Sequence, residues 1–328
     1  MIKGAWLTTN RSCNNSCEWC YAKKAKGGDM DVDNAKECID ALCEIGIKNI
    51  TLIGGEPTIY PHFFELVDYI KQKGLSVSLA TNGRKFRDID FVNKIIKSKI
   101  DGINISIKAL SEEEYYEKTK NYGLEDVVIG YANLIHEGYR PILSYVVIEY
   151  DEKQIVRLIS LLEDNKMDNI IFQFVKPVID FQSEDIMDLR DMGKMVRIIY
   201  NKMKVTNIKY KIEISFPICL VDENILENLI NENKIMTCCH VQAGRGIVFD
   251  TDFKVLPCNH FANFPFLEKS VGLTAKEILS LFNSEGVKNF RERTQCYPSN
   301  KCIECDNWDI CGGGCFSRWL YVDPNDYI

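Results

Sequence analysis

The sequence lacks the features of a membrane, secreted or nucleic-acid-binding protein. It has no run of about 20 apolar residues, the length that a helix needs to cross a bilayer. Its first residues lead straight into a strand pattern, without the regions of a signal peptide. It has 4 histidines, no long basic stretch and a net charge of -7, so the electrostatic footprint of a nucleic-acid binder is missing. We therefore expect a cytoplasmic protein without membrane or nucleic-acid partners.

Cysteine, in contrast, is abundant. The chain of 328 residues has 14 cysteines, and in a reducing compartment these favour metal or redox chemistry over structural disulfides. Hydrophobic residues make up 46% of the sequence and charged residues 27%, as in an ordinary globular protein. This length allows one large core or two domains.

Apolar runs rich in β-branched residues alternate with stretches of helical spacing. The runs lie at about 3–9, 48–53, 75–81, 101–107, 140–149 and 169–176. Such alternation predicts an α/β fold in which crossover helices join parallel strands. In the first helix, apolar residues recur at steps of three and four, which places Cys38 in the core. We expect this helix to begin at an N-cap, Asp33, and to end at Gly46.

Three cysteines follow the first strand in the pattern Cys13-x3-Cys17-x2-Cys20, with Trp19 before the last of them. Three thiolates can hold three irons of a 4Fe-4S cluster and leave the fourth iron open to a substrate or cosubstrate. A zinc site or a disulfide is the alternative. Zinc needs a fourth ligand of Cys or His type, and the nearest histidine, His62, lies far along the chain. The incomplete iron-sulfur cluster therefore fits better.

This cysteine loop resembles the defining loop of the radical S-adenosylmethionine (radical SAM) enzymes. The resemblance implies that S-adenosylmethionine chelates the open iron through its amino and carboxylate groups. One electron from the cluster would then break a carbon-sulfur bond and give a 5'-deoxyadenosyl radical. The resemblance also implies an external electron donor, such as flavodoxin or ferredoxin, and an open partial (β/α)6 barrel of the TIM type.

Residues at the ends of the next strands support the resemblance. In Gly54-Gly55-Glu56-Pro57, glycines let a ligand approach the backbone, and a carboxylate accepts hydrogen bonds from an ammonium group. An ordinary tight turn, and polar residues that merely end strands, are the plainer interpretations. The resemblance implies that S-adenosylmethionine is bound by Trp19, Gly54, Gly55, Glu56, Asn82, Ser106 and Lys108. Two of these, Ser106 and Lys108, are two residues apart in a strand and so point the same way.

A second cysteine group lies near the C-terminus, in the pattern Cys302-x2-Cys305-x5-Cys311-x3-Cys315. The spacing resembles the SPASM extension, which binds one or two auxiliary 4Fe-4S clusters in many radical SAM enzymes. Before it we expect a bridging helix over 185–203, an end to the β/α alternation, and a hairpin over 246–258. We therefore predict a radical SAM partial barrel with its bridging helix over 1–205 and a SPASM-like auxiliary cluster domain over 206–328.

The SPASM resemblance implies two sets of cluster ligands. The first set is Cys238 or Cys239, with Cys258 and Cys315, and the second is Cys302, Cys305 and Cys311. Neighbouring side chains in an extended segment point to opposite faces, so one cysteine of the adjacent pair is spare. A rubredoxin-like or zinc-ribbon site is the alternative for these cysteines.

The sequence departs from the SPASM pattern at two places. The glycine usual before the Pro-Cys cysteine is Phe253, and no final cysteine follows Cys315. The second cluster therefore needs a substitute ligand or is not built. The candidate substitutes are Cys296, Asp306, Asp323 and Asp326. Another cysteine, Cys219, is either a hydrogen-atom donor near the radical or a small apolar side chain.

The family context implies a ribosomally synthesised peptide as the substrate, with cross-linking, thioether formation, epimerisation or oxidation as the outcome. The alternative is a dehydrogenase or other modifier of a small molecule such as a sugar or cyclitol. A non-enzymatic alternative is an iron-sulfur electron carrier, which leaves the Gly-Gly-Glu-Pro turn without a purpose. The sequence identifies no catalytic base. Polar residues that either face the cavity or merely end later strands are Tyr145, Glu149, Gln173 and Lys176.

Overall fold

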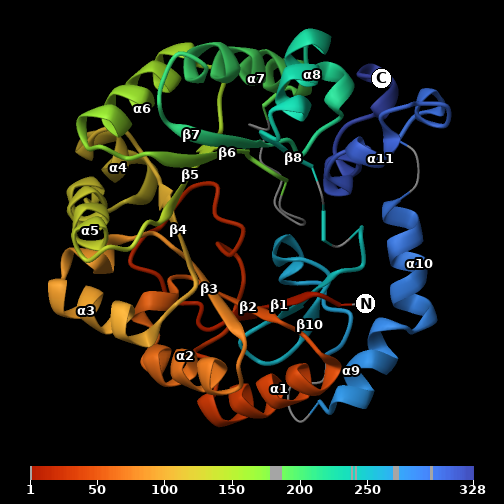
Figure 1. Ribbon diagram of the computed structural model, residues 1–328. Helices are drawn as coiled ribbons and strands as arrows, with labels where there is room; N and C mark the ends of the chain where they lie inside the picture. The colour runs from red at the N-terminus through yellow and green to blue at the C-terminus, as the bar shows by residue number, and fades with distance from the viewer. Residues whose placement is uncertain (1, 178–186, 238, 241, 269–272, 296–297) are drawn as a thin grey trace. The chain divides into compact units, whose positions relative to one another are not determined.

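The computed structural model of the chain describes residues 2–177, 187–237, 239–240, 242–268, 273–295 and 298–328 (Figure 1). The chain forms two compact units, 1–142 with 243–291 and 143–242 with 292–328. Each unit therefore takes residues from two separate stretches of the sequence. The predicted division into domains at residue 205 stays a prediction.

The first unit is built on a sheet with the strand order β10-β9-β1-β2-β3-β4. These strands are β1 (Gly4–Thr8), β2 (Asn49–Ile53), β3 (Ser76–Thr81), β4 (Gly102–Ile107), β9 (Gly246–Phe249) and β10 (Val255–Leu256). Strand β1 lies between β2 and β9 and pairs in parallel with both. Strands β9 and β10 are antiparallel and form the hairpin expected over 246–258.

Helices join and cover the parallel strands of the first unit. They are α1 (Val32–Ile45), α2 (Phe63–Gln72), α3 (Ile89–Ser98), α4 (Glu112–Thr119), α5 (Leu124–His136) and α9 (Ala275–Phe282), with the 3-10 helices η1 (Pro57–Ile59), η2 (Arg84–Arg87) and η4 (Asn259–Phe261). Leu7, Ile50, Val77 and Ile105, one from each of β1 to β4, are fully buried. Burying each such side chain stabilises the fold by roughly 1.5–3 kcal/mol, which makes the sheet a rigid base for the loops at its strand ends.

Helix α1 confirms most of its prediction from the sequence. Its apolar face, including Cys38, is buried, and Gly46 ends it with a φ of 87°, a conformation that glycine adopts without strain. The expected N-cap, Asp33, is wrong by two residues. The side chain of Asp31 caps the helix instead, because it accepts a hydrogen bond from Asn34 N at 2.9 Å.

The second unit contains a parallel sheet with the order β5-β6-β7-β8. Its strands are β5 (Ile142–Val147), β6 (Asn169–Phe174), β7 (Lys209–Glu213) and β8 (Ile235–Met236). Its helices are α6 (Glu152–Asp164), α7 (Leu189–Met203), α8 (Glu223–Asn231) and α11 (Trp308–Cys311), with η3 (Ile218–Leu220), η5 (Asn300–Cys302), η6 (Phe316–Leu320) and η7 (Pro324–Asp326). Figure 1 shows α6, α7 and α8 on one side of these strands. Helix α10 (Glu285–Thr294) includes residues of both units.

The six strands predicted between residues 3 and 176 are all present, with ends within two residues of those expected. The expectation that the β/α alternation stops after the bridging helix is wrong. Strands β7 and β8 and the helix α8 between them continue it, with parallel pairing. In β7 only Tyr210 and Ile212 are buried apolar residues, so the strand leaves a weak signal in the sequence.

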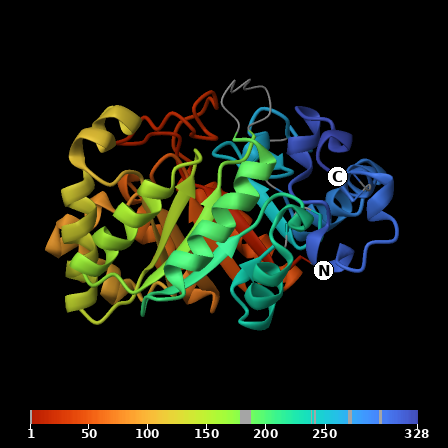
Figure 2. The same ribbon diagram turned by 90° about the horizontal axis from the view of Figure 1, so that it is seen from above.

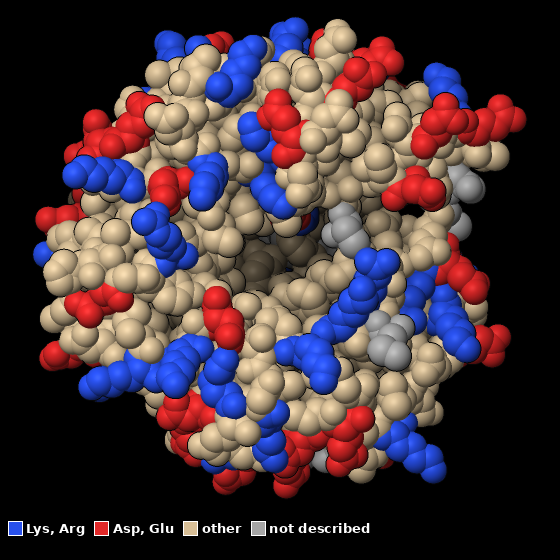
Figure 3. All heavy atoms as spheres, in the orientation of Figure 1, with Lys and Arg blue, Asp and Glu red and all other residues tan. Residues whose placement is uncertain are grey.

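The surface agrees with the modest net charge. On the face that Figure 3 shows, Lys and Arg side chains are interspersed with Asp and Glu. No helix in the described part of the chain combines the length and the apolar character that a bilayer crossing requires.

Candidate active site

The loop that follows β1 brings the three predicted cysteines together. Burial raises the pKa of Cys13 to about 11, against a hydrogen bond from Asn15 N that lowers it. The negative charges of Glu56, Cys17 and Cys20 raise the pKa of Cys13 by smaller amounts. The three thiols therefore lie close enough for their charges to interact. Iron binds thiolates, so loading this loop must release protons.

Hydrogen bonds to neighbouring helices fix this cysteine loop. Arg84 Nη1 donates to Asn14 O at 2.7 Å and to Asn15 Oδ1 at 3.1 Å, and Arg84 also pairs with Asp126 at 3.2 Å. Asn15 in turn donates to the hydroxyl of Tyr115 at 2.8 Å. The loop is therefore tied to Arg84 of η2 and Tyr115 of α4, and through Arg84 to Asp126 of α5.

The backbone of the same loop runs beside the end of α4. Ser16 N donates to Thr119 O at 2.8 Å, and Glu18 N donates to Lys118 O at 3.2 Å. Figure 2 shows this red loop next to the gold helix α4. Because both partners are backbone groups, this contact depends on the position of the helix more than on its side chains.

The two glycines of the Gly-Gly-Glu-Pro turn lie against the entrance to the cysteine loop. A Cβ atom on Gly54 would lie 2.4 Å from Asn10 Oδ1, and one on Gly55 would lie 2.2 Å from Ser12 O. Gly55 N donates to Asn10 O at 2.8 Å, and Glu56 N donates to Ser12 O at 2.9 Å. The cysteine loop of the chain itself thus requires the glycines, whereas the sequence suggested that a ligand requires them. Their contact with the cosubstrate stays a prediction.

Glu56 is a buried carboxylate that joins the ends of β2 and β3. Its Oε1 accepts hydrogen bonds from Thr58 N at 3.1 Å, Thr58 Oγ1 at 2.6 Å and Thr81 Oγ1 at 2.6 Å. Its Oε2 accepts one from Asn82 N at 2.7 Å. The Asn82 side chain donates to Asn14 Oδ1 at 2.6 Å, so Glu56 and Asn82 are both linked to the cysteine loop. A carboxylate held this firmly presents a fixed acceptor.

Ser106 in β4 and Lys108 just after it are in contact with each other, and Lys108 lies near the cysteine loop. Lys108 Nζ donates to Ser106 Oγ at 2.7 Å, which confirms that the two side chains point the same way. Burial raises the pKa of Cys17, and the positive charge of Lys108 works against this rise. Trp19 is partly buried in the loop. The structure therefore brings the predicted residues of β2, β3 and β4 to the three cysteines, while their binding of a cosubstrate stays a prediction.

Tyr21 lies near two predicted metal ligands, Cys20 and Cys258, and was not among the residues predicted for the site. Its hydroxyl donates to Gly54 O at 3.2 Å, and its ring centre is 5.7 Å from that of His260. Burial raises its pKa well above the usual range, and both Cys20 and Cys258 add to the rise. The only signal in the sequence was its place directly after Cys20.

An ion pair between Arg11 and Asp250, which was also not predicted, lies beside the cysteine loop. The two side chains are 5% and 6% exposed, so the pair is buried. It ties the residue before the cysteine loop to the residue that follows β9. Breaking such a pair is costly because it leaves one buried charge without compensation.

In the second unit, charged and polar groups gather at the ends of β6 and β7. Gln173 Nε2 donates to Glu213 Oε2 at 2.6 Å, and Lys176 forms an ion pair with Glu213. Burial lowers the pKa of His240 to about 4, and the charge of Lys176 lowers it further while that of Glu213 raises it. At the end of β5, Tyr145 donates to Gln154 at 2.7 Å.

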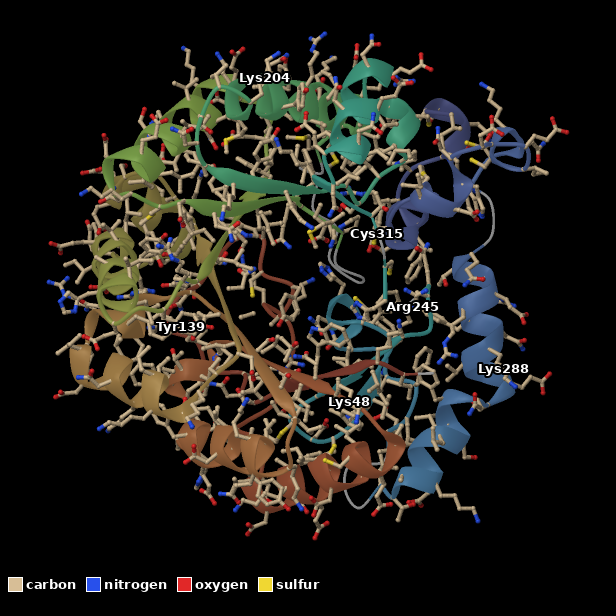
Figure 4. The ribbon with its side chains drawn as sticks, viewed as in Figure 1. Lys48, Tyr139, Lys204, Arg245, Lys288 and Cys315 are labelled. Carbon is tan, nitrogen blue, oxygen red and sulfur yellow. The ribbon has the colours of Figure 1, made fainter. Side chains whose placement is uncertain are left out.

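The described C-terminal cysteines fall in both units. Cys302, Cys305 and Cys311 of the second unit lie within electrostatic range of one another. Cys315, labelled in Figure 4, and Cys239 also belong to the second unit, and Cys258 belongs to the first. Cys238 and Cys296 lie outside the described residues. Among the suggested substitute ligands, Asp323 caps η7 by accepting from Asn325 N at 2.9 Å.

Among the residues that the structure describes, no three Cys, His, Asp or Glu side chains come close enough to hold a single metal ion.

Comparisons with known proteins agree with the arrangement of the cysteine loop and the strand ends. Residues 7–162 match the model of the Radical SAM superfamily. A protein of Sulfolobus acidocaldarius named Probable GTP 3',8-cyclase is 28% identical over 176 residues, which are 52% of this chain and 56% of that protein. One of the same name from Saccharolobus islandicus (strain M.14.25) is 26% identical over 227 residues, 66% of this chain and 72% of its own. The chain thus matches little more than half of the first relative.

Solved structures share the fold over nearly the whole chain. Streptococcus suis SuiB bound to S-adenosylmethionine has a TM-score of 0.75 and 16% identity, with 99% of this chain and 75% of SuiB covered. SuiB bound to precursor peptide SuiA gives a TM-score of 0.74 at 16% identity, with 99% and 74% covered. anSMEcpe with bound AdoMet gives 0.74 at 16% identity, with 100% and 93% covered. The predicted fold class, an α/β partial barrel with a cysteine-rich C-terminal part, is confirmed.

Proposed function

Because the chain is a radical SAM enzyme, with a radical SAM domain over residues 7–162, we propose that it uses S-adenosylmethionine to modify a ribosomally synthesised peptide. When bound, the 4Fe-4S cluster of the family supplies the electron that cleaves S-adenosylmethionine to a 5'-deoxyadenosyl radical. The cosubstrate, held by the residues of this site, would thus supply a radical able to remove a hydrogen atom from a carbon of the substrate. An electron donor such as flavodoxin or ferredoxin completes the cycle.

The observation that carries this proposal is the hydrogen-bonded link between the cysteine loop and the strand ends. Cys13, Cys17 and Cys20 would hold three irons. The Glu56 carboxylate, fixed by donors from β3, would accept hydrogen bonds from the cosubstrate ammonium group, and Lys108 would face its carboxylate. Opposite charges placed beforehand in this way orient a bound ligand at little cost in reorganisation.

A peptide is the leading substrate because two solved structures of similar fold hold one. SuiB is bound to its precursor peptide, and anSMEcpe is bound to AdoMet and a peptide. Auxiliary clusters in the C-terminal part would accompany this chemistry, with Cys302, Cys305 and Cys311 in one set and Cys258, Cys315 and one of Cys238 or Cys239 in the other. Cross-linking, thioether formation, epimerisation and oxidation are the expected classes of outcome.

The curated relatives favour a second candidate function. They are named for a reaction on a nucleotide, and the two described above match 52% and 66% of this chain. A small-molecule substrate, whether a nucleotide, a sugar or a cyclitol, is therefore the runner-up.

Anaerobic reconstitution followed by reduction with dithionite tests the proposal. We expect the wild-type protein to form 5'-deoxyadenosine from S-adenosylmethionine, and the Cys13→Ala/Cys17→Ala/Cys20→Ala variant to form none. Cys43→Ala is the matched control, because Cys43 lies in α1 outside both cysteine groups. A wild type that forms no 5'-deoxyadenosine above background would remove the basis for both candidate functions.

Deuterium transfer then decides between the two substrates. Peptides encoded by short reading frames beside the gene, and GTP, are each supplied in deuterated form. The true substrate transfers deuterium to 5'-deoxyadenosine, and mass spectrometry of the product identifies the modification. Transfer from GTP alone would reject the peptide in favour of the small molecule.

A further inference from the structure

Cys219 is the thiol that the structure brings to Cys302, Cys305 and Cys311. It lies in the middle of η3, directly after β7, far upstream of the other three in the sequence. The electrostatic neighbours of its thiol are Cys311, Cys302 and Cys305, all within the second unit. The backbone of Ile218, the residue before it, also forms a hydrogen bond with the thiol of Cys311.

Packing between two segments fixes this proximity. Cys315 N donates to Ser215 O at 2.9 Å, and Arg318 Nε donates to the same oxygen at 2.9 Å. Arg318 is 1% exposed, so this is a buried contact. Gly314 lies so close to Phe216 that a Cβ atom would be 2.6 Å from Phe216 Cα. The backbone that precedes Cys219 is therefore locked against the backbone that follows Cys311.

The side chain of Gln242 holds the other end of the C-terminal segment. Its Nε2 donates to Thr294 O at 2.8 Å, to Gly312 O at 3.3 Å and to Gly314 O at 3.2 Å. One amide thus bridges Thr294, which precedes Cys302, and the two glycines that follow Cys311. The three downstream thiols keep their place relative to Cys219 because both flanks of their segment are pinned.

We propose that Cys219 is the fourth ligand of a 4Fe-4S cluster whose other ligands are Cys302, Cys305 and Cys311. Four thiolates are the complete ligand set of such a cluster. Cys219 therefore replaces the carboxylates and Cys296 as the substitute ligand. A cluster ligated at all four corners has no open iron, so this one cannot bind a substrate directly. The inference rests on the auxiliary clusters of the proposed function.

Iron and sulfide analysis tests the ligand set. The parent is the Cys13→Ala/Cys17→Ala/Cys20→Ala protein, so that only C-terminal clusters are counted. We expect Cys219→Ala and Cys302→Ala to lose the same amount of iron, up to about four atoms per chain, and the double variant to lose no more. Cys43→Ala should keep the iron of the parent. If Cys219→Ala keeps all the iron that Cys302→Ala loses, the inference is overturned.

Alkylation of the otherwise unchanged protein gives a test that does not depend on a variant folding. Iodoacetamide should label Cys219 in the iron-free protein and fail to label it after reconstitution, while Cys43 is labelled equally in both. Equal labelling of Cys219 in both forms would reject its ligation. Formation of 5'-deoxyadenosine by Cys219→Ala with intact N-terminal cysteines reports on the proposed function separately, so the two failures are distinguishable.

Discussion

Gly55 stands where any side chain would collide with the backbone of the cysteine loop. In Gly55→Ala the new Cβ would lie 2.2 Å from Ser12 O and 2.6 Å from Arg11 O, and neither oxygen belongs to a flexible side chain. We expect a loss of about 1–3 kcal/mol in the free energy of unfolding and a reduced iron content at the N-terminal cluster. Urea unfolding and iron analysis of the reconstituted protein measure the two effects.

Gly28→Ala is the matched control for this change, because a Cβ atom on Gly28 would meet nothing within 4 Å. It should unfold at the wild-type urea concentration and load the same amount of iron. Similar losses in both variants would mean that the collision at Ser12 is not the cause.

Phe253 occupies a backbone conformation that favours glycine, with a φ of 62°, and its side chain is 5% exposed. The left-handed conformation costs a bulky residue about 1–2 kcal/mol, whereas removing a buried phenylalanine costs about 3–5 kcal/mol. The free energy gained by burying the Phe253 side chain therefore exceeds the cost of its backbone strain. We expect Phe253→Gly to unfold at lower urea concentration than wild type, with Phe253→Leu in between. A glycine variant more stable than wild type would show that strain dominates.

The sequence predicted which residues gather at the N-terminal site better than it predicted why. The spacing of Cys13, Cys17 and Cys20 is local, so the pattern itself brings the thiols together. The glycine at position 55 indicates that no side chain fits there. Only the folded chain shows that the backbone oxygen of Ser12 occupies the place of that side chain. Tyr21 could not be singled out, because its partner Cys258 is distant in sequence.

At the scale of elements, the N-cap of α1 offers a direct test of the corrected helix start. Asp31→Ala removes the acceptor for Asn34 N and should cost about 1 kcal/mol of stability. Asp33→Ala, at the N-cap expected from the sequence, should cost only a few tenths of a kcal/mol from the lost interaction with the helix dipole. Thermal unfolding of both variants measures the difference, and a larger loss in Asp33→Ala would contradict the observed cap.

Element prediction succeeded where the apolar runs were long and failed where they were short or ambiguous. Two aspartates near the start of α1 are equally good N-caps by residue type, and a single hydrogen bond decides between them. Strand β8 has two residues, Ile235 and Met236, and owes its existence to pairing with β7. Such elements are set by tertiary contacts, which local pattern does not report.

At the scale of the whole molecule, His240 makes stability depend on pH. Its pKa of about 4 in the folded protein lies below the ordinary value of 6.5. The unfolded chain therefore binds the additional proton between these values, and stability is lost as the pH falls from 6.5 towards 4. The shift corresponds to about 2 kcal/mol at pH 5 relative to pH 8. Urea unfolding at both pH values should show a smaller difference in His240→Gln than in wild type. Equal differences would contradict the assignment.

The sequence did not indicate that each unit of the molecule combines early and late segments. Hydrophobic periodicity describes neighbours along the chain, whereas β1 pairs with β9 and Cys219 approaches Cys302 across long separations. The same limit explains why the sequence did not indicate the fourth cluster ligand. From the sequence, Cys219 was either a hydrogen-atom donor or a small apolar side chain, and the packing of Ser215 against Cys315 is what brings it to the other cysteines.

The ion pair between Arg11 and Asp250 has a consequence for biosynthesis. Its partners are separated by 239 positions, so a ribosome must add all of these residues after Arg11 before the pair can form. At bacterial or eukaryotic translation speeds this interval is roughly 10–50 s. Throughout it, the early cysteines emerge from the exit tunnel without the support of β9, and the nascent chain depends on its surroundings to keep them reduced.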